Sequence, residues 1–369
     1  MKKLFSLLVV FVISFTIIPT CNAATELPTS LTMTEAIRLA TKNSNQLAIY
    51  KKEIETNKVN VQETDYTYKD TRSNFRPTNL QLGLIIDGYG VKQAELGLTI
   101  AEMTLDNYVS QLELKVKTDY YNLKSAMDKQ EKTGINYSYA NENLWIVHNK
   151  WLAGTATLME DLQATLAKSR AKVERNAAAR DIDYARKTLN VTLGLPMTTT
   201  YELVDSLPFV SETEFPDILV SSPDNIIDSA LKNKLEIVSA KGNLELSELN
   251  FTVTQKYTQS HTFKYQQAEI AVQTAEEKLK LAEQNAQLAI YKAYNDAMNS
   301  LESMQIAKSS AELAEQSYLM ALTQYDAGLT VNSEVINVFS SFKDAQISFE
   351  QIKLSYAINI ANYEALTTW

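Results

Sequence analysis

The chain has 369 residues, of which 45% are apolar, and its formal net charge is −9. Its 9 glycines and 7 prolines fall well below the ~7% and ~5% of average usage, although sheet-rich and loop-rich proteins need many such turn residues. These counts exclude collagen-like, low-complexity and disulfide-scaffold proteins. They predict a mainly all-α protein made of long, uninterrupted helices.

The first 24 residues have the pattern of a secretory signal peptide. Lys2 and Lys3 precede an apolar run over 4–18, and small residues follow up to Ala24. The apolar run is shorter than the ~20 residues of a membrane-spanning helix. The only cysteine, Cys21, raises lipid attachment as an alternative, but cleavage after residue 23 or 24 is favoured and leaves a chain without thiols. Disulfides and thiol catalysis are then excluded.

The charge of the exported chain limits its partners. Loss of the two signal lysines changes the net charge from −9 to −11. This balance argues against nucleic acid and against binding of anionic lipid through a basic face. No later segment is a long uncharged apolar run, so the sequence predicts an exported protein without a second helical span.

The positions of the helix-breaking residues outline the helices. No proline lies within 78–195 or 224–369, and glycines are few there. Between the helices we expect extended or irregular stretches at 67–90 and 253–265, and a proline-bearing linker at 195–223. Helices of about 60 residues would be ~90 Å long and need other long helices as partners. The predicted helices cover 34–66, 91–152, 156–192, 224–252, 266–326 and 330–366.

The two helical tracts carry the same internal mark. Trp-Leu-Ala-Gly at 151–154 aligns with Tyr-Asp-Ala-Gly at 325–328, and an upstream match relates 36–43 to 226–233. The offsets of these two matches differ by about sixteen residues, so the sequence predicts a tandem duplication with a shortened second half. The predicted organisation is a signal peptide at 1–24, a first repeat at 25–194, a linker at 195–223 and a second repeat at 224–369.

The long helix at 266–326 has two apolar stripes with a seven-residue repeat. One stripe contains Ala297, Met304, Ala311, Tyr318 and Tyr325, with small residues at Ser300, Ala307, Ala314 and Ala321. The other contains Ile306, Leu313 and Met320. Small residues in such a seam permit close helix approach. Two stripes predict neighbours on two sides, as in a sheet or cylinder of helices, and a simple four-helix bundle is the alternative.

Residues that could carry chemistry are sparse. The two histidines, His148 and His261, are 113 positions apart and are interpreted as ordinary surface or loop residues. Gly88 and Gly90 do not form a dinucleotide-binding loop, because Gln93 stands where a third glycine is needed. We therefore expect no metal, no cofactor and no enzymatic activity.

The duplicated order resembles the TolC-like outer-membrane efflux protein family. The resemblance rests on the opening phrase at 31–36, the long helix through 114–123 and the two aromatic-x-Ala-Gly marks. It implies a homotrimer in which twelve long antiparallel helices form a hollow cylinder below a membrane β-barrel. It also implies an outer-membrane or periplasmic location and work with a periplasmic adaptor protein and an inner-membrane transporter.

The resemblance also implies where the adaptor docks. Gly154 and Gly328 correspond to the turns at the periplasmic tips of the helices. Thr330 and Asn337 stand where the family often carries an arginine and an aspartate, which departs from that charged latch. The implied tip residues are Trp151, Ala153, Gly154, Glu160, Tyr325, Ala327, Gly328 and Glu334.

The segments available for membrane strands are short. Four strands of about ten residues need ~40 residues plus turns, whereas 67–90 and 253–265 together contain 37. Alternation over 80–86 predicts at most one short strand or hairpin, so the barrel strands are expected to be vestigial or absent. Two functions stay open: an efflux or secretion duct, and an exported coiled-coil structural or interaction protein without its own pore.

Overall fold

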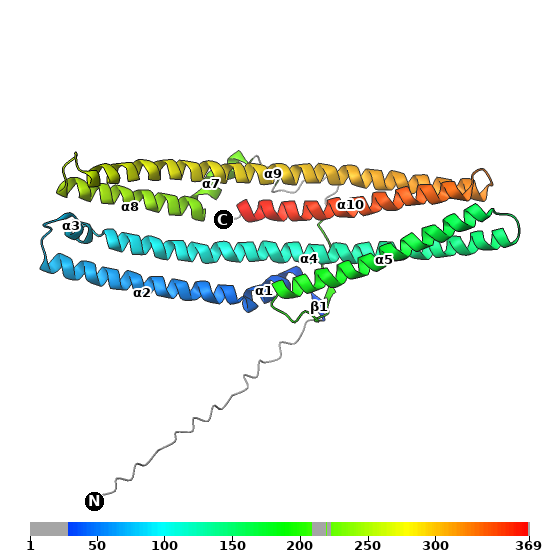
Figure 1. Cartoon of the computed structure of the whole chain (residues 1–369), viewed down its shortest axis with the longest axis horizontal. Coiled ribbons are helices and arrows are strands. Elements are labelled where there is room, and N and C mark those ends of the chain that lie inside the picture. The colour runs from blue at the N-terminus through cyan, green and yellow to red at the C-terminus, as the bar shows by residue number, and fades with distance from the viewer. Residues whose placement is uncertain (1–28, 209–218, 220–222, 368–369) are drawn as a thin grey trace, which may run out of the picture.

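A computed structural model describes residues 29–208, 219 and 223–367, so the predicted signal peptide lies outside the described residues. Two helices, α4 (Tyr89–Leu152) and α9 (Phe263–Asp326), contain 64 residues each, which corresponds to a length of ~96 Å. Figure 1 shows both running along the long axis of the molecule. The prediction of a mainly helical fold with very long helices is confirmed, and the helical ends at 152 and 326 fall where the sequence placed them.

Shorter helices pair along each long helix and set its neighbours. Two of them pack on α4 and two on α9, and α4 also packs against the second pair, which joins the two halves. By their contacts, α2 and α5 pack on α4, α4 packs on α8 and α10, and these two pack on α9. Figure 1 shows α9 at the top and α2 at the bottom, with α5 crossing α4. This order leaves α9 at one edge and α2 with α5 at the other. The shorter helices are α2 (Asn45–Asn74), α5 (Leu158–Thr192), α8 (Leu235–Tyr257) and α10 (Asn332–Thr367).

A compact core surrounds the middle of α4. Helix α1 (Met33–Asn43) lies over it, and a parallel pair of two-residue strands, β1 (Ser30–Leu31) and β2 (Glu202–Leu203), closes one side. The Tyr120 hydroxyl at the centre of this core donates to the carbonyl of Leu31 at 2.9 Å. A buried tyrosine with a satisfied hydroxyl fixes the position of the strand over the helix.

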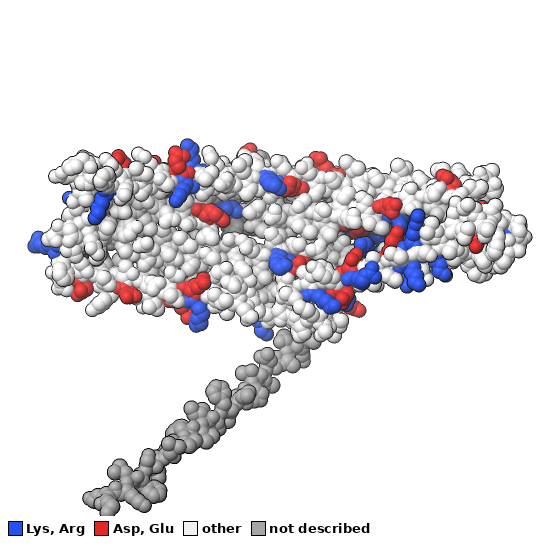
Figure 2. Space-filling model, in the orientation of Figure 1, with Lys and Arg blue, Asp and Glu red and all other residues white. Residues whose placement is uncertain are grey.

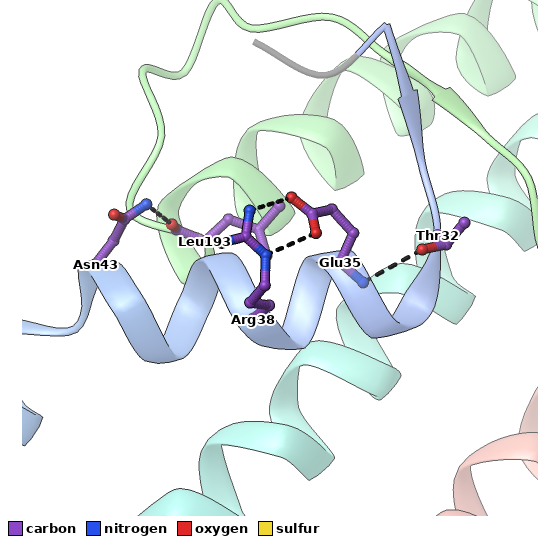
Figure 3. A network of polar contacts seen from close by, with 5 residues as sticks. All are labelled: Thr32, Glu35, Arg38, Asn43 and Leu193. Carbon is purple, nitrogen blue, oxygen red and sulfur yellow. Dashed lines mark hydrogen bonds and ion pairs between the residues drawn. The ribbon is translucent and has the colours of Figure 1, made fainter. Parts of the chain in front are cut away.

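Helix α1 is held at both of its ends, as Figure 3 shows. Its N-cap Thr32 accepts from the Glu35 amide, and the Glu35 carboxylate also pairs with Arg38 at 2.5 Å. At the other end, Asn43 Nδ2 donates to the carbonyl of Leu193 at 2.9 Å. The contact ties the start of the chain to the C-terminal end of α5.

A second core forms where the short helix α7 (Asp224–Lys232) packs on α9 and α10. Its fully buried members include Ile290, Met304 and Tyr363. Helix α7 directly follows the predicted linker, of which 209–218 and 220–222 lie outside the described residues. Leu219 of the linker and Ile227 and Ala230 of α7 are buried in the same core, which anchors the linker's end to the long helices.

The predicted seam of α9 is confirmed. Four of its five seven-spaced residues are buried and Tyr325 is half-buried, and the small side chains beside them are buried or half-buried. The second stripe, in contrast, is not covered by the described part of the chain: Ile306, Leu313 and Met320 are 68%, 69% and 62% exposed. It lies on the edge helix.

The strand predicted around residues 80–86 is wrong, because Leu80–Ile86 forms the helix α3. Asn79 caps this helix by accepting from the Leu82 amide at 3.0 Å. Gly83 packs directly on the ring of Tyr257, where an added Cβ would lie 2.3 Å from Cε2. Period-two alternation over seven residues did not distinguish a strand from a short helix, and the cap and the flat contact with α8 decided for the helix.

Other boundaries also differ from those expected, with helices extending into stretches that were predicted to be irregular. The helix predicted at 34–66 is interrupted at Ser44, which caps α2, and α2 then continues to Asn74. The predicted irregular stretch at 253–265 is reduced to the turn between α8 and α9. Within the described part of the chain, β1 and β2 are the strands, with two residues each. No helix among those residues is both long enough and apolar enough to cross a membrane.

Candidate functional site

The turn between α4 and α5 closes with two hydrogen bonds onto the last turn of α4. Ala153 is the last residue of helical conformation, and Gly154 follows with φ of +73°. The Gly154 amide donates to the Trp151 carbonyl at 2.9 Å, and the Thr155 amide donates to the Lys150 carbonyl at 2.9 Å. This pairing is the Schellman motif, which satisfies carbonyls that a helix end leaves free.

The turn between α9 and α10 has the same geometry. Gly328 has φ of +72° and follows Ala327. The Gly328 amide donates to the Tyr325 carbonyl at 2.9 Å, and the Leu329 amide donates to the Gln324 carbonyl at 2.8 Å. Both turns lie at one end of the molecule, the right-hand end of Figure 1.

Both turns need glycine because its backbone adopts positive φ, and not because a larger side chain would clash with neighbouring atoms. A Cβ built at Gly154 or Gly328 meets no atom within 4 Å. Side chains of L-residues are disfavoured at positive φ, whereas glycine adopts it freely. The turns are therefore open surfaces whose shape depends on one residue each.

The two predicted glutamates have different surroundings. Glu160 forms a capping box at the start of α5: the Thr157 amide donates to its Oε2 at 2.7 Å, and its own amide donates to Thr157 Oγ1 at 3.2 Å. The hydrogen bond from the Thr157 backbone lowers the pKa of Glu160. Glu334, in the first turn of α10, has an exposed side chain. The first glutamate holds its own helix start, and the second presents its charge to solvent.

Trp151 is half-buried beside a polar pair that the sequence did not indicate. Its ring centroid lies 5.5 Å from that of His148. His148 Nδ1 contacts Asp161 Oδ1 at 2.9 Å, which joins α4 to α5 just behind the turn. His148 is half exposed, as expected for a surface histidine, but the partner of its ring is a largely buried carboxylate. The two residues are 13 positions apart in sequence and lie on different helices, so their pairing can be recognised only once the turn between the helices is placed.

A cation joins the two tips to each other. Lys150 Nζ on α4 donates to the hydroxyl of Tyr325 on α9 and lies 4.8 Å from the centre of its ring. The predicted residues Trp151 and Tyr325 therefore lie on adjacent tips. The sequence analysis missed Lys150, which precedes the aromatic position by one residue.

An aromatic cluster behind the tips packs α4 on the second hairpin. Tyr139 of α4 lies 4.2 Å from Phe339 and 5.9 Å from Tyr318 between ring centroids, and Tyr318 stacks on Phe342 at 5.7 Å. Burial raises the pKa of Tyr318. The cluster fixes the two tips side by side.

The tips expose apolar side chains within an acidic surface. Leu152 is 66% exposed, Leu329 is 80% exposed and Val331 is 60% exposed. The two turn segments, 149–161 and 323–335, contain four acidic residues and one lysine, for a net charge of −3. Exposed apolar side chains rimmed by charge are typical of a protein interface.

Among the residues that the structure describes, no group of three or more His, Cys, Asp or Glu could hold a metal ion. What the described tips offer is a contact surface.

No family model and no curated protein matches this sequence. Solved structures match it closely in shape. The chain is similar to OprN, described as an outer-membrane channel, with a TM-score of 0.73, 13% identity, and 91% of this chain and 89% of that chain covered. It is similar to VceC, an outer membrane protein from Vibrio cholerae, with a TM-score of 0.71, 13% identity, and 91% and 96% covered. It is also similar to the CmeC outer membrane channel of Campylobacter jejuni, with a TM-score of 0.70, 14% identity, and 91% and 85% covered.

These neighbours are channel proteins, not enzymes, and they bear out at the level of fold the resemblance carried by the two Ala-Gly marks. The chain has the fold of the TolC-like outer-membrane channels.

Proposed function

We propose that this protein is a non-enzymatic subunit of an export duct in the cell envelope. Three copies form a closed ring of helices, and the tips dock onto a periplasmic adaptor that links the ring to an inner-membrane transporter. The observation that carries this proposal is the pair of matching glycine turns, side by side at one end of two ~96 Å helices.

Both edges of the molecule carry apolar stripes that a ring would cover. On α9 the exposed residues of the stripe are spaced by 7, 11 or 18 positions, close to whole numbers of helical turns, so they share one face. They are Ile270, Leu281, Leu288, Ile306, Leu313 and Met320, each at least 55% exposed. On α5 the same spacing relates Met159, Leu166, Val173, Tyr184 and Val191, each at least 50% exposed. Two different edges of one chain fit a head-to-tail contact, which closes into a ring.

The ring is tested by the mass of the purified protein in solution. We expect three times the mass of one chain by light scattering, and a hollow outline in electron microscopy. Leu313→Glu places a charge in the α9 stripe and should give monomers, whereas Gln351→Glu on the exposed surface of α10 should leave the assembly intact. A monomeric wild type, or trimers of the Leu313→Glu variant, would contradict the ring.

Docking at the tips is tested separately. Replacing Gly154 or Gly328 by tryptophan distorts the turn and should reduce crosslinking to the adaptor and export, while helicity measured by circular dichroism stays unchanged. The acidic and apolar surface of the tips fits a partner surface that is basic and apolar. Normal partner binding by both variants would disprove the tip assignment.

A second candidate is a pore-less envelope protein of the same fold. The observation in its favour is that α8 and α9 are joined by only five residues, 258–262, at the end opposite the tips. A solid bundle in electron microscopy would support it, and a hollow cylinder would favour the duct.

A further inference from the structure

The end of the molecule opposite the tips carries two exposed phenylalanines. Phe75 ends α2 and is 57% exposed, and Phe263 begins α9 and is 83% exposed. They come from segments almost 190 residues apart in sequence. Phenylalanine is among the most often buried residues, so exposed examples in both end loops point to an interaction surface.

Two contacts hold these loops together. Lys256 of α8 pairs with Asp87, just after α3, at 2.8 Å. The ring of Tyr257 covers Gly83 of α3. Both loops therefore lie at one end of the molecule, the left-hand end of Figure 1.

This end is basic although the chain is acidic. From the last turn of α2 to the first turn of α4 (71–92), and from the last turn of α8 to the first turn of α9 (254–266), there are five Lys or Arg residues and one Asp. The local net charge is +4, against −9 for the whole chain. Figure 2 shows Lys and Arg atoms at the left-hand edge of the molecule.

Each exposed phenylalanine is followed directly by a cation. Arg76 follows Phe75, and Lys264 follows Phe263. Neither cation takes part in an ion pair within the described part of the chain. An apolar ring beside a long basic side chain suits a bilayer surface, because the ring enters the acyl boundary while the cation stays among the phosphates.

We propose that this end binds the surface of a bilayer containing anionic phospholipid, with Phe75 and Phe263 as the inserted side chains and Arg76 and Lys264 at the headgroups. The net charge of the chain argues against anionic lipid as a partner, but that count averages over two ends of opposite charge. The surface is separate from the tips, so this proposal stands independently of the docking proposal.

The experiment measures flotation of the exported chain, residues 25–369, with vesicles. Wild type should float with vesicles of phosphatidylcholine and phosphatidylglycerol (7:3 molar mixture, about 50 mM salt) and less so at about 500 mM salt, where charges are screened. The Phe75→Ala, Phe263→Ala double variant should bind about tenfold or more weakly, since it loses two inserted rings. The matched control, Leu152→Ala with Leu329→Ala at the tips, should bind like wild type.

A fluorescent label reports which end of the molecule faces the bilayer, without changing the residues proposed to insert. The exported chain contains no cysteine, so Thr78→Cys and Thr155→Cys each accept one environment-sensitive fluorophore. Emission should shift to the blue on vesicle addition for the label at 78 and stay unchanged at 155. Absence of flotation by wild type, unchanged flotation of the phenylalanine variant, equal binding to neutral vesicles, or a shift at 155 alone would each overturn the proposal.

Discussion

Replacing Gly154 by alanine tests the geometry of the tip turns most directly. The added Cβ meets no atom within 4 Å, so the only penalty is the strain of an L-residue at φ of +73°. That strain is about 1–2 kcal/mol. The tip should therefore open about 5–30 times more often, while the rest of the 64-residue helix keeps its packing.

Amide hydrogen exchange resolves this local effect. The Thr155 amide, which donates to the Lys150 carbonyl, should exchange about 5–30 times faster in the Gly154→Ala variant. Gly154→Asn should have a smaller effect, because asparagine tolerates the left-handed region better than alanine.

Gly194 supplies the contrasting case. Its φ is +67°, but an added Cβ would also lie 2.6 Å from the Cβ of Asn43. Gly194→Ala should destabilise the whole protein by more than Gly154→Ala does, measured as the free energy of unfolding in urea. Equal effects of the two alanine variants, or no faster exchange at Thr155, would refute the reasoning from positive φ.

Three further outcomes are expected. The hydrogen bond from the Thr157 backbone holds the pKa of Glu160 below its usual value, so the capping contribution is present above the pKa of the unfolded chain and is lost as pH falls through the folded value. The exchange difference between wild type and Glu160→Gln should therefore shrink from pH 6 to pH 3. The double-mutant cycle Lys150→Met, Tyr325→Leu, which removes both the hydroxyl and the ring, should give a coupling of about 0.5–1 kcal/mol, and a value of zero would remove the proposed link between the tips. Asn190→Leu should cost about 1–3 kcal/mol of unfolding free energy, since its buried amide donates to two carbonyls in 197–199, and an unchanged melting temperature would contradict this.

The wild type also has a stability signature that follows from its shape. The long helices contact neighbours along their sides, so exchange protection should be highest near Tyr120 and Ile290 and fall toward both ends. Uniform protection along α4 would contradict this.

The sequence by itself determined the long helices and the position of the tip turns. Helix ends at residues 152 and 326 follow from glycines, which adopt positive φ without the strain of most other residues, and the buried seam of α9 follows from a seven-residue spacing. Such features depend on local backbone preference and periodicity, which a chain carries in any context.

Tertiary structure alone decided the features that depend on a distant neighbour. Residues 80–86 form a helix because Tyr257 lies against Gly83, and no window around that segment contains Tyr257. Likewise, Lys150 meets Tyr325 only because the two hairpins end at the same level. The charge of the whole chain is fixed by composition, but the basic and acidic ends exist only because folding brings 71–92 beside 254–266 and 149–161 beside 323–335. Local sequence patterns specify the helices and the turns. The surfaces depend on contacts between residues more than 150 positions apart, and those contacts form only when the helices have packed.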